Sequence, residues 1–356
     1  MVWWIGIVTT NAKSVLTTST ESTGVVTVDL LLLVPSISTE NLRKLQAFRV
    51  IFRTSCGTIL PMKPISIVTH SGTFHADDVF AVAMVKLLLK ETSHTLTRTR
   101  DEAILHSADW LLDIGNTYNP ETKRFDHHMR EGAGARENGI PYAACGLVWK
   151  HYGETLAGSP EAQEIVDTEL IQTIDALDNG SHAVSFNPHL GDSPYTIRTL
   201  IQRSFRPAWN STESFDEAFD TAVTYAQEIL LREIHQASSS IAKRTYAKKL
   251  YDESVDKRIL ISPIGISAGS FIPFPEVNIV IAPDLSRDGY YAVQAVGVSP
   301  DTFDARVYFP ESWAGLRDDA LVQHTGIAGS VFCHKGRHFA VANNLEDAQR
   351  LALLAK

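Results

Sequence analysis

The 356-residue sequence contains little cysteine, no excess of basic residues and no long apolar run. Its three cysteines, Cys56, Cys145 and Cys333, lie far apart and form no CxxC pair, which argues against a disulfide framework and favours a reducing compartment. A net charge of −9 argues against nucleic-acid binding by overall basicity, but not against an enzyme that holds phosphates with metal ions and a few arginines. The apolar run at residues 25–34 is interrupted by Asp29 and is too short to cross a membrane.

Residues 1–61 differ from the rest of the chain. They are rich in serine and threonine and contain no histidine, and the basic residues between positions 43 and 53 have no acids nearby after Glu40. Met62 starts the sequence MKPISIVTH, which suits a first β-strand. We expect residues 1–61 to be an N-terminal extension that reflects a misassigned start, a targeting segment or an accessory segment. We expect a cytoplasmic protein, or a nuclear or mitochondrial one in a eukaryote, without a membrane partner.

Strand and helix patterns alternate between residues 62 and 190. This alternation predicts an α/β domain with a mainly parallel sheet and helices on both of its faces. The expected strands are residues 64–69, 95–100, 109–114 and 123–126, and the expected helices are residues 77–90, 142–152 and 161–177.

The remaining sequence predicts a helical connector at residues 191–256 and a smaller α+β domain at residues 257–356. The connector contains a long helix at 214–249, which we expect to be broken. The C-terminal domain has expected strands at 258–262, 277–282, 290–296 and 306–309, followed by a closing helix at 345–354.

Histidines and aspartates gather at the predicted strand ends. Imidazole and carboxylate are ligands of divalent ions such as Mn²⁺, Co²⁺ and Zn²⁺, and parallel sheets collect ligands at the carboxyl ends of their strands. The number of these groups suits two ions that share a carboxylate, for which Asp113 is the candidate. Asp78 is interpreted as a helix cap alone, and Asp126 could orient a neighbouring histidine. The grouped residues are His70, His75, Asp77, Asp113, Asp126, His127, His128, Asp175 and Asp178.

Six motifs resemble the melanocyte-proliferating-gene (Myg) family of metal-dependent hydrolases, in the DHH phosphoesterase superfamily. They are THSGTFHADDVFAVAM at 69–84, DIG at 113–115, RFDHH at 124–128, IDALDNG at 174–180, FRPAW at 205–209 and GIAGSVFCHKGRHF at 326–339. The resemblance runs from about residue 63 to the end of the chain. It implies a parallel-sheet domain that holds two metals, and a smaller domain that binds substrate.

Roles follow from this resemblance by position. Asp113 matches the bridging acid, and His128 resembles the residue that contacts the scissile phosphate and assists protonation, with Asp126 beside it in the catalytic group. His75 stands where much of the superfamily has an aspartate. Asp178 suits the fourth motif better than Asp175, which remains an alternative. The implied metal ligands are His70, His75, Asp77, Asp113, His127 and Asp178.

A glycine-rich turn near the C-terminus is the candidate substrate loop. Gly329 and Ser330 could present backbone N–H groups to an anion, and His334 and Arg337 add positive charge close by. The resemblance gives this loop contact with a substrate phosphate.

The resulting hypothesis is a divalent-metal-dependent phosphoesterase, a 3′–5′ exonuclease on RNA or short oligonucleotides that uses a water activated by two metal ions. Mn²⁺ is the expected metal, with Mg²⁺, Co²⁺ or Zn²⁺ as alternatives. The other hypotheses are a hydrolase of a small phosphorylated molecule and a non-catalytic metal-binding regulator. The sequence leaves the oligomeric state open, a homodimer included.

Overall fold

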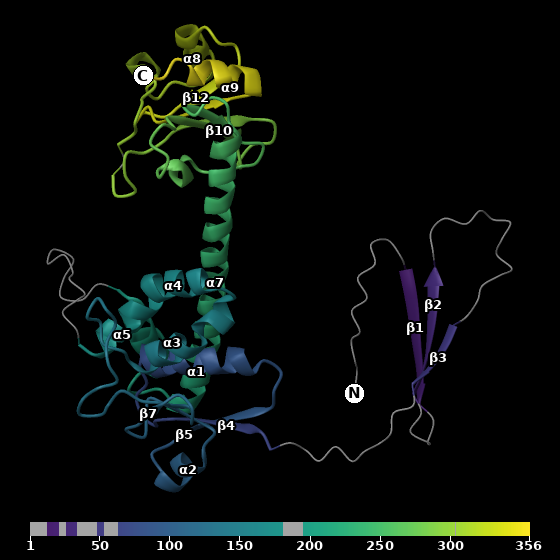
Figure 1. The fold of residues 1–356 in the computed structure, drawn as a ribbon, viewed down its shortest axis with the longest axis vertical. Coiled ribbons are helices and arrows are strands. Elements are labelled where there is room, and N and C mark those ends of the chain that lie inside the picture. The colour runs from purple at the N-terminus through teal and green to yellow at the C-terminus, as the bar shows by residue number, and fades with distance from the viewer. Residues whose placement is uncertain (1–12, 21–25, 34–47, 53–62, 181–194, 303) are drawn as a thin grey trace. The chain divides into compact units, whose positions relative to one another are not determined.

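A computed structural model describes residues 13–20, 26–33, 48–52, 63–180, 195–302 and 304–356 (Figure 1). The chain divides into two units, Met1–Pro64 and Ile65–Lys356. In the first unit, strands β1 (Lys13–Thr20), β2 (Val26–Leu33) and β3 (Phe48–Phe52) form an antiparallel sheet in that order. Most of residues 1–61 lies outside the described residues, so their interpretation as an extension stays a prediction.

The second unit begins with a five-stranded sheet in the order β5-β4-β6-β8-β7. Four strands are parallel to their neighbours, and β7 alone is antiparallel, to β8. The α/β class is therefore as predicted, in a mixed sheet. Its strands are β4 (Ile65–Thr69), β5 (His94–Arg98), β6 (Trp110–Leu112), β7 (Tyr118–Asn119) and β8 (Arg124–Phe125).

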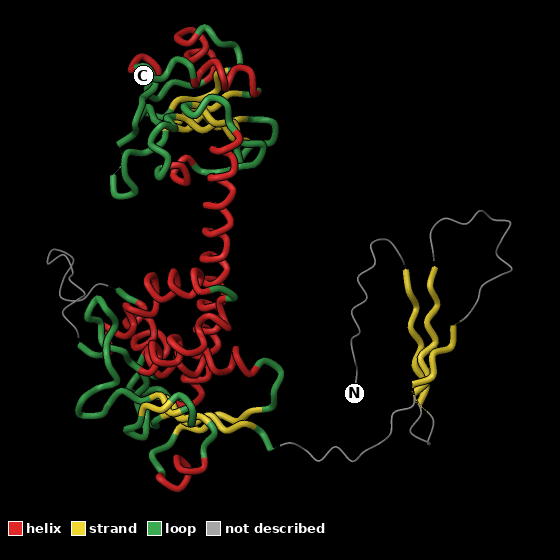
Figure 2. The backbone as a smooth tube through the Cα atoms, viewed as in Figure 1, coloured by secondary structure: helices red, strands yellow, loops and turns green. Residues whose placement is uncertain are grey.

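Helices cover both faces of this sheet (Figures 1 and 2). Because side chains alternate along a strand, Val68 and Leu111 pack with Leu105 of α2 (Glu102–Ser107) on one face. Ile67 and Leu112 point to the other face and join the main core. That core is built with α1 (Ala76–Leu89) and α3 (Ala144–Ala157). Residues 76–85 of α1 are all buried, as expected of a helix that is apolar on every side.

The predicted helix at residues 161–177 is interrupted. It consists of α4 (Pro160–Val166), a π-helical turn η1 (Asp167–Ile171) and α5 (Gln172–Asp178). Such turns insert an extra residue into the helical ladder and are frequent at functional sites.

A single long helix follows the short α6 (Ile197–Leu200) and a second π-helical turn, η3 (Ile201–Phe205). This helix, α7 (Phe215–Glu253), has 39 residues and is continuous, so the predicted break is wrong. Ser214 and Glu217 form a capping box at its start. Its first half contributes Phe219 to the main core, and its last turns contribute Ala247 to another cluster.

The C-terminal residues form a second mixed sheet in the order β12-β13-β11-β10-β9. Only β9 and β10 are parallel to each other, and the other pairs are antiparallel. Its strands are β9 (Ile259–Ile261), β10 (Ile279–Pro283), β11 (Tyr291–Ala295), β12 (Ser330–Cys333) and β13 (Phe339–Ala342). The helical elements are η4 (Ala268–Phe271), η5 (Glu311–Trp313), α8 (Asp318–Thr325) and α9 (Leu345–Ala352).

The strand predicted at residues 306–309 is not formed. The guanidinium of Arg306 donates to the carbonyls of Ile272, Phe274 and Val277, which ties this segment to a turn. Among the described residues, no helix is long and apolar enough to cross a membrane.

Candidate metal centre

Histidine and aspartate side chains meet where three parallel strands end. His70 follows β4, Asp113 follows β6 and His127 lies just after β8. These strands are adjacent and parallel, so their carboxyl ends lie at one edge of the sheet. His75 joins them from the start of α1 and Asp178 from the end of α5. The structure therefore brings together residues that are more than one hundred positions apart in the sequence.

Asp113 lies between two histidines. Its φ of +57° is in the left-handed region, which aspartate tolerates better than most residues. Its Oδ2 lies 3.3 Å from Nε2 of His70, and its Oδ1 lies 3.4 Å from Nε2 of His127. Burial alone would raise the pKa of Asp113, but the two imidazoles hold it well below its usual range. One oxygen towards each histidine is the arrangement expected of a bridging carboxylate.

The His70 ring turns one nitrogen towards two carboxylates. Its Nδ1 lies 3.2 Å from the carbonyl oxygen of Ser71, which can only accept, so Nδ1 carries the proton of this hydrogen bond. Its Nε2 faces Asp78 Oδ2 at 3.2 Å and Asp113 Oδ2 at 3.3 Å. Burial lowers the pKa of His70, but the two carboxylates outweigh burial and raise the pKa to about 10. The nitrogen therefore needs a cation between itself and the carboxylates, either a proton or a metal.

His127 has three carboxylates around one nitrogen. Its Nε2 lies 3.4 Å from Asp113 Oδ1, 3.4 Å from Asp178 Oδ2 and 3.8 Å from Asp77 Oδ2. This nitrogen is buried and has no hydrogen-bond partner. Burial lowers the pKa of His127, but the Asp113 carboxylate outweighs it and the net pKa is raised.

Asp77 is fully buried and closes the start of α3. Its Oδ1 accepts from the N–H of Cys145 at 2.6 Å and its Oδ2 from that of Ala144 at 3.1 Å. These are two of the N–H groups that a helix start leaves unpaired. Burial and the charges of Asp113 and Asp178 raise the pKa of Asp77 well above its ordinary value. A bound cation would oppose both causes, because it would stabilise the charged carboxylate in its buried place and offset the neighbouring negative charges.

Asp78 does cap α1, as predicted, but only with one oxygen. Its Oδ1 accepts from the N–H groups of His75 at 2.7 Å and Val79 at 2.9 Å. Its Oδ2 is buried and has no hydrogen-bond partner. The sequence does not reveal this second, unpaired oxygen, because adjacent acids at a helix start look alike.

Two arginines hold the loop that carries His75. Arg98 Nη2 donates to the carbonyl of Gly72 at 2.7 Å, and Arg206 Nε donates to the carbonyl of Phe74 at 2.6 Å. The Phe74 ring lies between the guanidinium groups, 5.6 Å from Arg98 Cζ and 5.8 Å from Arg206 Cζ. The loop between β4 and α1 is therefore pinned at two carbonyls.

His128 differs from His127 in its exposure and its partner. Its side chain is 55% exposed, and its Nδ1 lies 2.7 Å from Asp126 Oδ1. The same oxygen accepts from the N–H groups of His127 and His128, and Oδ2 accepts from that of Asn116. The hydrogen bond to Asp126 raises the pKa of His128. Asp126 therefore orients the ring and leaves Nε2 outward, while its predicted catalytic role stays a prediction.

Asp175, the alternative to Asp178, has a different partner. Its Oδ2 forms an ion pair with Arg136 at 2.7 Å, and its Oδ1 accepts from the N–H of Gly146 at 2.9 Å. Arg136 also binds Asp167 of the π-helical turn. A Cβ on Gly146 would lie 1.8 Å from the Asp175 carboxylate, so glycine is required at this approach. No motif in the sequence marks Arg136, because its partners Asp167 and Asp175 lie more than thirty positions away.

The predicted substrate loop differs from a simple anion-binding turn, because its N–H groups at Gly329 and Ser330 already have acceptors within the protein. The N–H of Gly329 donates to Asp347 Oδ2 at 2.9 Å, and the N–H of Ser330 to the carbonyl of Ile327 at 3.1 Å. The His334 ring lies 4.7 Å from the His338 ring. Arg337 Nη1 donates to the carbonyl of Phe309 at 3.3 Å. Of the four predicted residues, His334 and Arg337 retain polar groups that could reach a ligand.

The donor set fits divalent ions. Three polar atoms at this edge are buried without a hydrogen-bond partner, namely Asp78 Oδ2, Asp113 Oδ1 and His127 Nε2. Native proteins rarely leave such atoms unpaired unless an ion or water is missing. Among the described residues, four groups have ligand atoms within 4.8 Å of one another. Three lie in this cluster: His70 with His75 and Asp78, Asp77 with His127 and Asp178, and Asp113 with His127 and His128; the fourth is Asp77 with Cys145 and Asp175.

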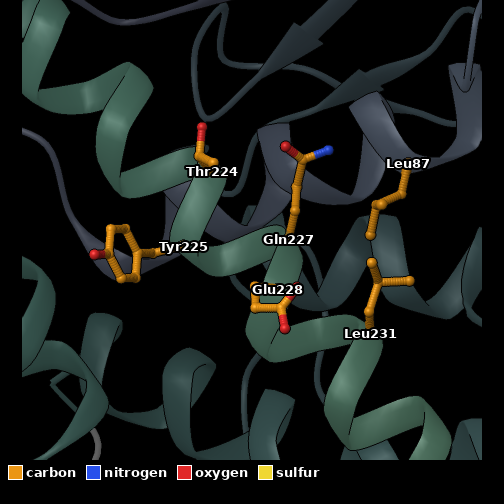
Figure 3. A pocket seen from close by; sticks show the side chains of 6 residues that line it. All are labelled: Leu87, Thr224, Tyr225, Gln227, Glu228 and Leu231. Atoms are coloured by element: carbon orange, nitrogen blue, oxygen red, sulfur yellow. The ribbon is translucent and has the colours of Figure 1, made fainter.

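The groove in Figure 3 is a different site from the histidine and aspartate cluster. It is lined by Leu87 of α1 and by residues of α7, with Tyr225 and Leu231 among them. None of the predicted site residues lines it, and Glu228 is its one ionisable carboxylate. The histidine and aspartate cluster is the better candidate for catalysis.

Comparison with known proteins places this chain in a family. Residues 66–355 match the family model described as an uncharacterised protein family, UPF0160. The chain is 30% identical to the MYG1 exonuclease of Mus musculus, over 82% of this chain and 84% of that protein. It is 28% identical to a MYG1 protein of Schizosaccharomyces pombe (81% and 96%) and 28% identical to that of Chlamydia trachomatis (80% and 94%). The chain therefore belongs to the Myg family, UPF0160.

Proposed function

We propose that this chain is a divalent-metal-dependent phosphoesterase of the DHH type, an exonuclease that degrades RNA or short oligonucleotides from the 3′ end. The observation that carries the proposal is the Asp113 carboxylate between His70 and His127, with buried ligand atoms left unpaired on either side. The exonuclease name of the mouse relative supports nuclease activity. In this proposal residues 62–190 hold the metals, residues 191–256 connect, and residues 257–356 bind substrate.

The proposed ligands of two ions are those expected from the sequence. Bound Mn²⁺, or alternatively Mg²⁺, Co²⁺ or Zn²⁺, would supply Lewis acidity towards a phosphoryl oxygen and lower the pKa of water. Asp113 would serve both ions because its two oxygens face different histidines. The proposed ligands are His70, His75, Asp77, Asp113, His127 and Asp178.

His128 is the proposed proton donor to the leaving oxygen. The Asp126 carboxylate accepts a hydrogen bond from the Nδ1–H of His128, which fixes the tautomer and the direction of Nε2. Because Asp126 also raises the pKa of His128, more of the imidazole stays protonated near neutral pH. A general acid needs this protonated form.

The C-terminal loop is the proposed contact for a substrate phosphate. The N–H groups of Gly329 and Ser330 have internal acceptors, so these residues would shape the turn. His334 and Arg337 would then provide the charge, since Arg337 uses Nη1 on one carbonyl and has further N–H donors.

A substrate panel tests this function. Purified protein is stripped of metal, supplied with Mn²⁺, and incubated with end-labelled single-stranded RNA, pyrophosphate or a chromogenic phosphodiester. The proposal expects single-nucleotide shortening of 5′-labelled RNA and slow or absent release from pyrophosphate. Preferential turnover of pyrophosphate would instead favour a hydrolase of small phosphorylated molecules. Absence of turnover on all three substrates would leave a metal-binding regulator.

A further inference from the structure

We propose that Asp78 is a metal ligand, and that with His70 and His75 it forms a site distinct from that of Asp77, His127 and Asp178. The inference rests on the proposed metal dependence and adds a residue to it. Asp77 and Asp78 would then serve different ions, although they are adjacent in the sequence. Asp113 would supply one oxygen to each site.

The first support is the division of labour between the two oxygens of Asp78. Oδ1 satisfies the N–H groups of His75 and Val79, which completes the cap of α1. Oδ2 does not take part in the cap. It is buried and makes no hydrogen bond, in a side chain that is 0% exposed, and Nε2 of His70 lies 3.2 Å from it. Burying a charged oxygen without a partner is costly. Capping therefore explains the position of Oδ1 but not that of Oδ2.

The second support is the direction of the His70 ring. A histidine that ligates a metal commonly donates its other N–H to a carbonyl or carboxylate, and His70 directs Nδ1 to the carbonyl of Ser71. Its Nε2 then points at Asp78 Oδ2, 3.2 Å away. A neutral imidazole would place a lone pair against a carboxylate lone pair, which is unfavourable unless a cation lies between them.

The third support is the position of His75. Its ring centroid lies 5.9 Å from that of His70, and His70, His75 and Asp78 can bring one ligand atom each within 4.8 Å of one another. The loop between the histidines is held by Arg98 and Arg206 through the carbonyls of Gly72 and Phe74. The two imidazoles are thus presented together with the free oxygen of Asp78.

The oxygens of Asp77 have different partners from those of Asp78. Both of its oxygens accept N–H groups from the start of α3, and its Oδ2 is directed to His127. Apart from the shared Asp113, the Asp78 site therefore has two imidazoles and one carboxylate, while the Asp77 site has one imidazole and two carboxylates. Because imidazole suits zinc-like ions and carboxylate suits Mg²⁺ or Mn²⁺, the two sites should differ in metal preference.

The variant Asp78→Asn separates the cap from the ligand. The asparagine side-chain oxygen can still accept from His75 and Val79, while its NH₂ group replaces Oδ2 and cannot bind a cation. The matched control is Asp101→Asn at the start of α2, where the carboxylate accepts from the N–H of Ala103. Each protein is stripped with a chelator and titrated with Mn²⁺, and bound metal is counted by mass spectrometry. Thermal unfolding of the stripped proteins reports whether the cap is intact.

The wild type and Asp101→Asn should each bind two Mn²⁺ ions. Asp78→Asn should lose one ion, or bind it at least about 10-fold more weakly, the lower limit seen when the outer partner of a metal ligand is removed. Two ions bound by Asp78→Asn with unchanged affinity would overturn the inference and leave the proposed function standing if the wild type hydrolyses RNA. A wild type that binds no ion would overturn both.

Crystals of the wild type grown with Mn²⁺ provide a second test that does not depend on a variant folding. Anomalous scattering locates the ions directly. An ion at about 2.2 Å from Asp78 Oδ2, an ordinary distance for a carboxylate ligand, supports the inference. Occupied ions that leave Asp78 Oδ2 beyond bonding distance would overturn it.

Discussion

Asp113 Oδ1 lies 3.4 Å from His127 Nε2, yet neither atom has a hydrogen-bond partner. Two buried polar atoms this close and unpaired are poorly explained as packing. The other oxygen of Asp113 lies at a similar distance, 3.3 Å, from Nε2 of His70. Both distances leave the carboxylate available to ions on either side, and this geometry motivates the following predictions.

Metal uptake should release protons. The carboxylates of Asp113 and Asp78 raise the pKa of His70 to about 10, so at pH 8 the metal-free protein holds a proton that an ion must displace. The apparent affinity for Mn²⁺ should therefore rise with pH up to about 10. Calorimetric titration in two buffers of different ionisation enthalpy measures the protons released. A binding heat that is the same in both buffers would contradict this prediction.

Asp126→Asn should shift the pH dependence of turnover. The Asp126 carboxylate raises the pKa of His128 by accepting a hydrogen bond from its Nδ1–H. Removing this carboxylate should therefore lower the pKa of His128. Because the proposed acid works only when protonated, the alkaline fall in kcat should begin at a lower pH in the variant. His128→Gln is the control and should abolish this limb. A variant with low activity but an unshifted limb would show that Asp126 acts through structure alone.

Arg136→Met should destabilise the fold more than an exposed counterpart. Arg136 pairs with Asp175, whose side chain is 0% exposed, and its loss would leave that carboxylate uncompensated. We expect a loss of about 3–5 kcal/mol in the free energy of unfolding. Arg232→Met breaks the exposed pair with Glu228 and should cost about 0–1 kcal/mol. Denaturant titration measures both values, and equal losses would count against a structural role for the buried pair.

The substrate loop should affect binding more than metal uptake. Replacing His334 and Arg337 together by alanine should raise KM for RNA, by about 10-fold or more if two charge-assisted contacts are lost. Bound Mn²⁺ should stay at the wild-type level, because the proposed ligands follow strands β4, β6 and β8 or belong to α1 and α5, and none belongs to the C-terminal loop. Steady-state kinetics at two salt concentrations measures the effect. An unchanged KM would remove this loop from the proposed substrate site.

Local patterns predicted most of the fold. Alternating apolar runs and helical periods identified four strands of the β5-β4-β6-β8-β7 sheet and the main helices that cover it, because burial sets these periods directly. The two-residue β7 was missed because a strand that short has no periodicity, whereas the equally short β8 is marked by the histidines that follow it. The sequence also could not show that Arg306 binds three carbonyls of a turn, in a segment that forms no strand.

The candidate site was less fully predictable. Strand ends and the family motifs indicated His70, Asp113 and His127, and the structure brings these residues together. Whether Asp77 or Asp78 keeps an oxygen without an N–H donor depends on the N–H groups around it, including those of α3. Such contacts join segments distant in sequence, and no local pattern reports them.

The Mn²⁺ dependence of RNA hydrolysis in the wild type and in Asp113→Asn decides whether Asp113 holds the metal ions that hydrolyse RNA. Both proteins are stripped of metal, checked for equal folding, and assayed on 5′-labelled RNA with and without Mn²⁺. We expect wild-type turnover only with Mn²⁺, and a loss of at least about 100-fold in kcat for Asp113→Asn, comparable to removing one preorganised charge-stabilising group from an active site. Equal turnover by the two proteins, or wild-type turnover without any divalent ion, would contradict it.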